Sequence, residues 1–242
     1  MKIKTLLIAA GALAAGVISS QAQVYSQNIV GYANIATPNG GTYALAVPFK
    51  VGVSNGANEV WPLIAGSPTI PDGSSLLLWN GSSYVTFFSV SGSPSLWDDN
   101  GGNFLSGAPV LPVGQGFFLI PAGSTTNSFI GAVAINVGTS NVTLLANGGT
   151  YLVSPAVPYG GSITNGTATG GGPGLSSNNN MPDGSSLLIW TGNGYTTYFS
   201  DSGSPSLWDD NGGNFLPAAP NITVGQSFFI IPAGDFTWKV GL

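Results

Sequence analysis

The chain of 242 residues contains no cysteine, no histidine and no arginine, and it has only four lysines. Without cysteine it can form no disulfide, and it offers no thiol nucleophile and no thiolate metal ligand. Without histidine it cannot build a Ser-His-Asp or Cys-His catalytic centre, and imidazole metal ligation is excluded. Nine acidic residues outnumber the four lysines. The sequence therefore has no basic patch for nucleic acid or for an anionic membrane.

Charged residues make up only 5% of the chain, whereas hydrophobic residues make up 43%. This apolar content is enough for one or two packed cores, so the chain is not a disordered polar tract. Solubility must come from the abundant serine, threonine, asparagine and glycine. That balance is more typical of extracellular β-structure than of a cytosolic enzyme.

The first 22 residues have the pattern of a secretory signal peptide. Lys2 and Lys4 precede the apolar stretch 5–19, and Ser20-Gln21-Ala22 fits a small-x-small cleavage site. The apolar stretch is too short and wrongly flanked for a membrane span, and no later segment is long or apolar enough for a transmembrane helix. We therefore expect a secreted or cell-surface protein that begins near Gln23, with no membrane span in the mature chain.

The sequence contains a long internal repeat. Residues 70–123 match residues 181–234 at 39 of 54 positions, without a gap and at a constant offset of 111. The match continues more loosely upstream, where residues 39–49 correspond to residues 147–159. The repeat predicts two homologous modules of about 110 residues each, at residues 23–126 and 127–242. Within the second module, residues 160–180 are so rich in Gly, Ser and Asn that we expect a flexible loop that buries nothing.

Each copy contains β-prone stretches separated by turn formers. Asn80-Gly81 and Gly192-Asn193-Gly194 each divide two such stretches, which predicts two hairpins. Phe117-Phe118 and its counterpart Phe228-Phe229 lie in strand patterns, where adjacent side chains point to opposite faces, so both faces of these strands should be covered. The one helical signal, at residues 57–64, ends at Pro62. We predict an all-β fold with very little helix, in which each copy is a β-sandwich or a small barrel.

Several short motifs recur in the same order in both copies. In the first copy they are Leu45–Pro48, Trp79–Tyr84 and Pro112–Phe118. In this order the motifs resemble those of secreted bacterial β-modules with Leu-x-x-x-Pro, Trp-x-Gly-x-x-Tyr and Pro-Gly-x-Gly-Phe elements, here as a tandem pair. The first copy also has a Val-Trp-Pro turn at Val60-Trp61-Pro62, which belongs to the pattern. The second copy departs from the pattern, because it lacks this turn and has Thr223 where the first copy has Pro112. The resemblance implies an all-β surface module and no particular chemistry.

The stretch SGSPSLWDDNGGNFL occurs without change at residues 91–105 and 202–216. Tryptophan beside Asp and Asn could stack on a sugar ring and bind its hydroxyls, but it could equally plug the end of a β-unit, which is the interpretation that we favour. We expect the loop to be an ordered lid, with the tryptophan turned inward and with Phe104-Leu105 as a second apolar anchor. The candidate ligand-binding residues are Trp97, Asp98, Asp99, Asn100, Trp208, Asp209, Asp210 and Asn211.

The acidic residues of this loop allow two interpretations. Their oxygens could bind Ca²⁺, for which Asp98, Asn100, Asp209 and Asn211 are the candidate ligands. Neighbouring residues on an extended backbone point to opposite faces, however, so the three polar residues in a row do not converge on one ion. We favour a structural turn in which the Asp or Asn side chains accept hydrogen bonds from backbone amides before the glycine pair. No other cofactor is indicated.

Taken with the predicted export, these features favour a structural or adhesive β-repeat protein of the cell surface without catalytic activity. The alternative is a carbohydrate-binding protein with one site per copy at the duplicated loop, whose partners would be extracellular glycans or other surface components. Paired carboxylates can catalyse glycoside hydrolysis. The acids available after residue 22 are Glu59 and eight aspartates, six of which form duplicated sets. Because so few acidic residues are available for catalysis, an enzyme is the least favoured of the three hypotheses.

We predict that the exported protein starts within a few residues of Gln23, because cleavage should follow the small residue Ala22. Mass spectrometry and N-terminal sequencing of the protein recovered from the exporting cells would measure this. A mature chain that still carries Met1 would contradict the export prediction.

Overall fold

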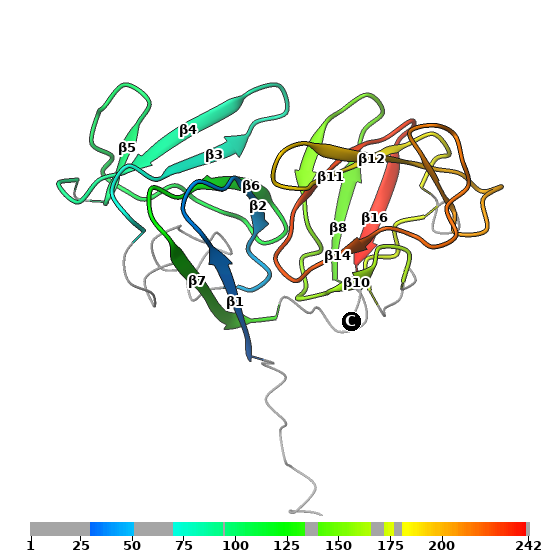
Figure 1. Ribbon diagram of the computed structural model, residues 1–242, viewed down its shortest axis with the longest axis horizontal. Coiled ribbons are helices and arrows are strands. Elements are labelled where there is room, and N and C mark those ends of the chain that lie inside the picture. The colour runs from blue at the N-terminus through cyan, green and yellow to red at the C-terminus, as the bar shows by residue number, and fades with distance from the viewer. Residues whose placement is uncertain are drawn as a thin grey trace, which may run out of the picture.

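The computed structural model describes residues 30–50, 70–93, 95–133, 140–165, 172–176 and 181–240 (Figure 1). The predicted signal peptide and the predicted helical turn at residues 57–64 lie outside these ranges. The described residues form strands and turns with no helix, which confirms the all-β class. No helix in this part of the chain could cross a membrane.

The first half of the described chain, residues 30–133, contains seven strands. They are β1 (Val30–Thr37), β2 (Tyr43–Ala46), β3 (Ser75–Trp79), β4 (Tyr84–Ser89), β5 (Trp97–Asp99), β6 (Gly116–Ile120) and β7 (Thr125–Ala132). Five of them form an antiparallel sheet in the order β2-β6-β3-β4-β5, and β1 pairs with β7 in a two-stranded ribbon. The module boundary predicted between residues 126 and 127 therefore falls inside β7, which the pairing places with the first half.

The second half, residues 140–240 with gaps, repeats this arrangement. Its strands are β8 (Ser140–Leu145), β9 (Tyr151–Val153), β10 (Gly161–Ser162), β11 (Ser186–Trp190), β12 (Tyr195–Ser200), β13 (Trp208–Asp210), β14 (Asn221–Ile222), β15 (Phe228–Ile231) and β16 (Phe236–Val240). The sheet order is β9-β15-β11-β12-β13, and β8 pairs with β16. Both predicted hairpins are present, as β3-β4 and β11-β12.

The Gly-rich stretch at residues 160–180 is described at residues 160–165 and 172–176, and these residues differ from the expectation. The short strand β10 pairs with β14, and Ile163 and Leu175 are fully buried in the core of the second half. The backbone amide of Leu175 donates to the carbonyl of Ile163 at 3.0 Å. The expectation that this stretch buries nothing is therefore wrong for these residues, because two apolar side chains among many small ones are enough to anchor it.

Each half has its own hydrophobic core between its sheet and its ribbon. On β6, Phe117 and Leu119 face this core together with Phe129 of β7, whereas Phe118 points to the opposite face. The same alternation on β15 places Phe228 in the core of the second half. The prediction that both faces of these strands are covered is confirmed.

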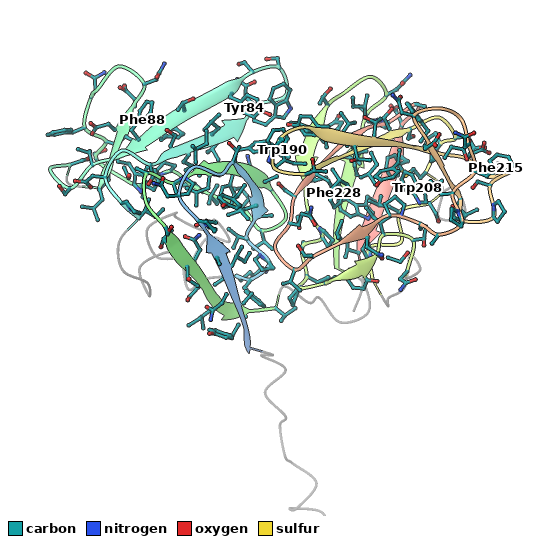
Figure 2. The ribbon with its side chains drawn as sticks, viewed as in Figure 1. Tyr84, Phe88, Trp190, Trp208, Phe215 and Phe228 are labelled. Carbon is teal, nitrogen blue, oxygen red and sulfur yellow. The ribbon has the colours of Figure 1, made fainter. Side chains whose placement is uncertain are left out.

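The outer faces of the two five-stranded sheets pack against each other through aromatic side chains. The rings of Phe118 and Phe229 have centroids 6.5 Å apart, and each also meets a tryptophan of the other half edge-on. The Trp79 indole N–H donates to the Thr150 carbonyl at 2.8 Å, and the Trp190 indole N–H donates to the Thr42 carbonyl at 2.7 Å. The contacts are reciprocal, so they join the halves through an approximate two-fold axis. Figure 2 shows Trp190 at this junction.

Backbone hydrogen bonds also cross the junction at the sheet edges. The Ala46 amide of β2 donates to the Gly225 carbonyl at 2.8 Å, and the Ser154 amide, just after β9, donates to the Gly114 carbonyl at 2.9 Å. Strands β2 and β9 are the edge strands of their sheets. Each half therefore covers an edge that would otherwise be open to pairing with another chain.

Residues on the approximate axis meet their own counterparts. Tyr84 and Tyr195 share a side-chain hydrogen bond at the rim of the junction. Burial raises the pKa of both phenols, and for Tyr84 the hydrogen bond to Tyr195 raises the pKa further. Gly116 approaches Ser227 so closely that a Cβ on Gly116 would lie 2.6 Å from Leu152 Cγ and 2.7 Å from Ser227 Cβ.

We predict that Gly116→Val destabilises the protein by about 1–3 kcal/mol, because the added atoms overpack the junction. Urea unfolding monitored by tryptophan fluorescence would measure the change. Gly107→Val is the matched control, since a Cβ there has nothing within 4 Å. Equal unfolding midpoints for the two variants would contradict the tight junction.

Candidate functional site

The tryptophans of the duplicated loop lie inside the protein. Trp97 is 2% exposed and Trp208 is fully buried, and each belongs to the core of its own half. This confirms that the indole of each loop is turned inward, whereas the closing of one end of each β-unit by the loop stays a prediction. The buried Trp208 Nε1 has no hydrogen-bond partner among the described residues. Neither indole offers a face to a ligand in this structure.

The residue before each tryptophan has an unusual backbone. Leu96 and Leu207 have φ angles of 64° and 65°, in the left-handed region that costs a branched side chain about 1–2 kcal/mol. The next carbonyl is held in place, because Ser93 Oγ donates to the Trp97 carbonyl at 2.7 Å and Ser204 Oγ repeats this at Trp208. Packing and hydrogen bonds thus hold a strained turn that brings the indole inward. The sequence does not reveal this turn, since leucine gives no signal for positive φ.

Asp99 and Asp210 hold the tip of their own loops. Asp99 Oδ1 accepts hydrogen bonds from the Gly101 amide at 2.7 Å and from the Asn103 amide at 2.9 Å. The Asn103 side chain donates to Asp99 Oδ2 at 2.9 Å, and Asp210 has the same contacts with Gly212 and Asn214. These hydrogen bonds hold the pKa of both carboxyls below the usual range. The bonds from the Asn103 and Asn214 side chains lower the pKa most. The structural turn predicted for these residues is confirmed.

Asp98 and Asp209 point the other way, as expected for neighbours on a strand. In both residues Oδ1 is buried and has no hydrogen-bond partner among the described residues. Burial raises the pKa of the Asp209 carboxyl, and a contact with Asp201 raises it further. Asp201 corresponds to Val90 in the first half, so the pair of carboxyls occurs only once. Two identical loops therefore have different electrostatic surroundings.

An acidic pocket lies beside this pair in the second half. It has a volume of about 430 Å³ and is lined by four carboxylates, those of Asp183, Asp201, Asp209 and Asp210. Within the described part of the chain, no three acidic residues are arranged to hold a metal ion. Asn100 and Asn211 are exposed at the loop tips. Calcium binding at Asp98, Asn100, Asp209 and Asn211, and ligand binding at the loop as a whole, remain predictions.

Phe104 was expected to anchor the loop together with Leu105, but it is 60% exposed, and its counterpart Phe215 is 58% exposed. Only their neighbours Leu105 and Leu216 pack against the cores. Adjacent side chains on the extended return of the loop face opposite sides, so one of each pair must point outward. The expectation that Phe104 is an anchor is therefore wrong. Each duplicated loop instead presents a solvent-exposed phenylalanine beside its braced turn.

The two loops lie far apart. Strand β5, at the start of the first loop tip, lies at one end of the longest axis of the molecule (Figure 1), and Phe215 of the second loop lies at the other end (Figure 2). No protein-family model, curated protein or solved structure matches the chain. The function of the loops must therefore be inferred from their own geometry.

We predict that replacing both Trp97 and Trp208 by alanine lowers the free energy of unfolding by several kcal/mol, since each removes a large buried side chain from a separate core. Replacing Asp99 and Asp210 by asparagine should cost far less, because asparagine keeps the oxygen that accepts from the loop amides. Calorimetric melting of the two double variants would compare these effects. An unchanged melting temperature without the tryptophans, together with quenching of these two indoles by acrylamide in the original protein, would contradict the lid.

Proposed function

We propose that the protein is an exported structural or adhesive element of the cell surface, which joins two surfaces through its duplicated loops and performs no catalysis. The observation that carries this proposal is the placement of two identical, internally braced loops at opposite ends of one two-fold unit, each with an exposed phenylalanine. Export rests on the signal-peptide pattern of the first 22 residues.

The bracing of the loops suits them to contact. The Asp99 and Asp210 turns and the buried tryptophans fix each loop before any partner arrives, so little conformational entropy is lost on binding. Exposed aromatic side chains supply much of the binding energy at protein surfaces. Phe104 and Phe215 have this role in the proposal. Each is flanked by glycine and asparagine residues of its own loop, and the second loop also borders the acidic pocket.

Two contacts made by the same loop sequence at opposite ends make the chain bivalent. A bivalent molecule can bridge two surfaces even when each contact is weak, because the second contact forms at a high effective concentration. The reciprocal junction between the halves keeps the loops apart, so they cannot both serve one small partner. The geometry supports a bridge better than it supports a catalyst, since the Asp99 and Asp210 carboxylates are engaged by their own loops.

The test is a bridging assay with beads that carry envelope fragments of the producing cells. We expect the purified chain to cluster these beads. Phe104→Ser and Phe215→Ser should each abolish clustering but leave attachment to single beads, because one loop remains. The double variant should lose attachment as well.

Tyr32→Ser is the matched control, since Tyr32 is 64% exposed on β1 and lies outside both loops. The proposal is overturned if beads still cluster with the double variant Phe104→Ser with Phe215→Ser. It is also overturned if the Tyr32→Ser variant loses clustering. Clustering that depends on the phenylalanines but is inhibited by free sugar would instead favour the carbohydrate-binding alternative, with Phe104 and Phe215 in place of the buried tryptophans.

A further inference from the structure

Two grooves lie at the junction between the halves, away from the duplicated loops. The first has a volume of about 450 Å³, and the second, its counterpart across the two-fold axis, about 260 Å³. In the first groove, the β3 hairpin end and residues 113–115 come from one half, and residues 149–153 come from the other. The second groove uses the corresponding residues 190–192 and 223–226, facing residues 42–45 and Ile35. Each groove exists only because the halves dock.

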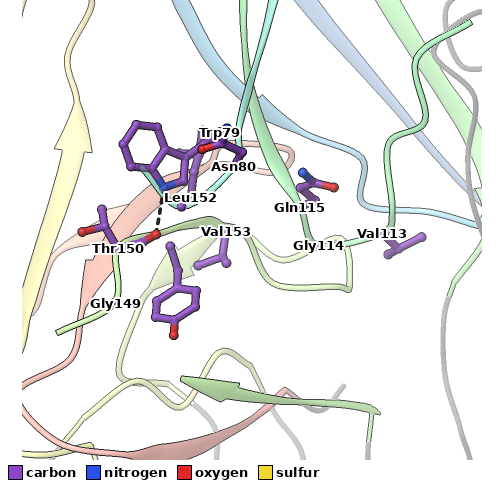
Figure 3. A pocket seen from close by; sticks show the side chains of 11 residues that line it. Trp79, Asn80, Val113, Gly114, Gln115, Gly149, Thr150, Leu152 and Val153 are labelled. Atoms are coloured by element: carbon purple, nitrogen blue, oxygen red, sulfur yellow. Dashed lines mark hydrogen bonds between the residues drawn. The ribbon is translucent and has the colours of Figure 1, made fainter. Parts of the chain in front are cut away.

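The grooves have the same chemical character. Neither is lined by a carboxylate or a lysine, although the protein as a whole is acidic. The first is lined by Trp79 and Tyr151, together with carboxamide and hydroxyl side chains and the apolar Leu152 and Val153. Figure 3 shows Trp79 and Thr150 on one side of Leu152 and Val153, with Gln115 on the other. An uncharged groove with aromatic walls and a few polar groups does not select an ionic ligand.

The aromatic wall of the first groove is held in place before any ligand binds. The Trp79 indole N–H is bonded to the Thr150 carbonyl, and the Tyr151 hydroxyl accepts from the Ala146 amide at 3.0 Å. Both rings are half-buried, so each keeps part of its surface open. Side chains fixed in this way lose little entropy when a ligand packs on them.

Gln115 is the polar group available to a ligand in the first groove. Its carboxamide makes no hydrogen bond to another described residue, whereas Gln226, its counterpart, accepts at Oε1 from the Thr223 amide at 2.9 Å and from the Thr223 hydroxyl at 3.2 Å. The first half has Pro112 where the second has Thr223. Proline has neither an amide hydrogen nor a hydroxyl, so it cannot hold Gln115 in the same way. A free carboxamide provides two donors and an acceptor side by side.

We propose that the first groove binds a neutral saccharide, with sugar C–H faces packed on Trp79 and Tyr151 and hydroxyl groups bonded to the Gln115 carboxamide. Aromatic rings offer a flat apolar face, and a carboxamide can both donate to and accept from neighbouring hydroxyls. An extended peptide fits less well, because the Gly114 carbonyl already pairs with the amide that follows β9, and Gln115 bridges to Val153. No residue of the duplicated loops lines this groove, so sugar binding there does not require them.

The test begins with an array of neutral gluco-, manno-, galacto- and xylo-oligosaccharides, with uronic acid and sulfated glycans and an extended peptide as comparison ligands. Titration calorimetry with the best neutral oligosaccharide then measures affinity. We expect a neutral oligosaccharide to bind, and Gln115→Ala to weaken binding about tenfold, as for the loss of hydrogen bonds worth about 1.4 kcal/mol. Pro112→Thr should weaken binding about threefold, because it supplies the groups that hold Gln226 in the other groove.

Gln226→Ala is the matched control and should leave the affinity unchanged. Melting temperatures of all variants show that the fold is intact. The proposal is overturned if no neutral glycan binds, if charged glycans or the peptide bind equally well, or if Gln115→Ala has no effect on affinity. It is also overturned if Phe104→Ser with Phe215→Ser abolishes glycan binding, which would place the sugar at the loops. Bead clustering that persists in Gln115→Ala separates this result from the bridging function.

Discussion

The docking of two sheets through reciprocal aromatic contacts is the constraint on which the rest of the structure depends. Trp79 and Trp190 each reach across the junction to a backbone carbonyl of the other half, and Phe118 and Phe229 fill the space between them. This contact covers the outer faces of both sheets, protects the edge strands β2 and β9, and sets the direction in which each duplicated loop points. A chain with so few charges gains little from ion pairs, so apolar contact and backbone hydrogen bonds must hold the junction.

Most of the local structure was predictable from the sequence, but the junction was not. The hairpin turns at Asn80-Gly81 and at residues 192–194 carry strong local signals, and the alternation at Phe117-Phe118 predicted a strand covered on both faces. The sequence could not show that the second face of that strand is covered by the other half, because no local pattern reveals which surface a side chain meets. The partner of β7 was also hidden, since β1 lies some ninety positions earlier in the chain.

The duplicated loop shows both what residue types reveal and what they conceal. Its aspartates and glycines correctly predicted a braced turn, and its tryptophan correctly predicted a buried plug. Phe104 was misassigned because an aromatic residue next to leucine is compatible with either face. Identical letters also hide different surroundings. Asp209 interacts with Asp201, whose counterpart in the first half is Val90, and Gln226 is held by Thr223, whereas its counterpart Gln115 is not held in this way. The two copies therefore differ in their polar contacts because of residues that lie outside the unchanged stretch at residues 91–105 and 202–216.

The contact between Gly116 and Ser227 affects how the halves recognise each other. On a two-fold axis, a residue meets its own counterpart, and here the two counterparts are not the same. Two second halves docked in this same geometry would place two serine Cβ atoms about as close as a Cβ on Gly116 would lie to Ser227 Cβ, which is 2.7 Å, so the junction would have to shift. Two halves of the first kind would leave a gap between two glycines. The contact therefore favours the pairing of a first half with a second half. Where second halves of several partly unfolded chains are exposed to one another, the two serines disfavour their association.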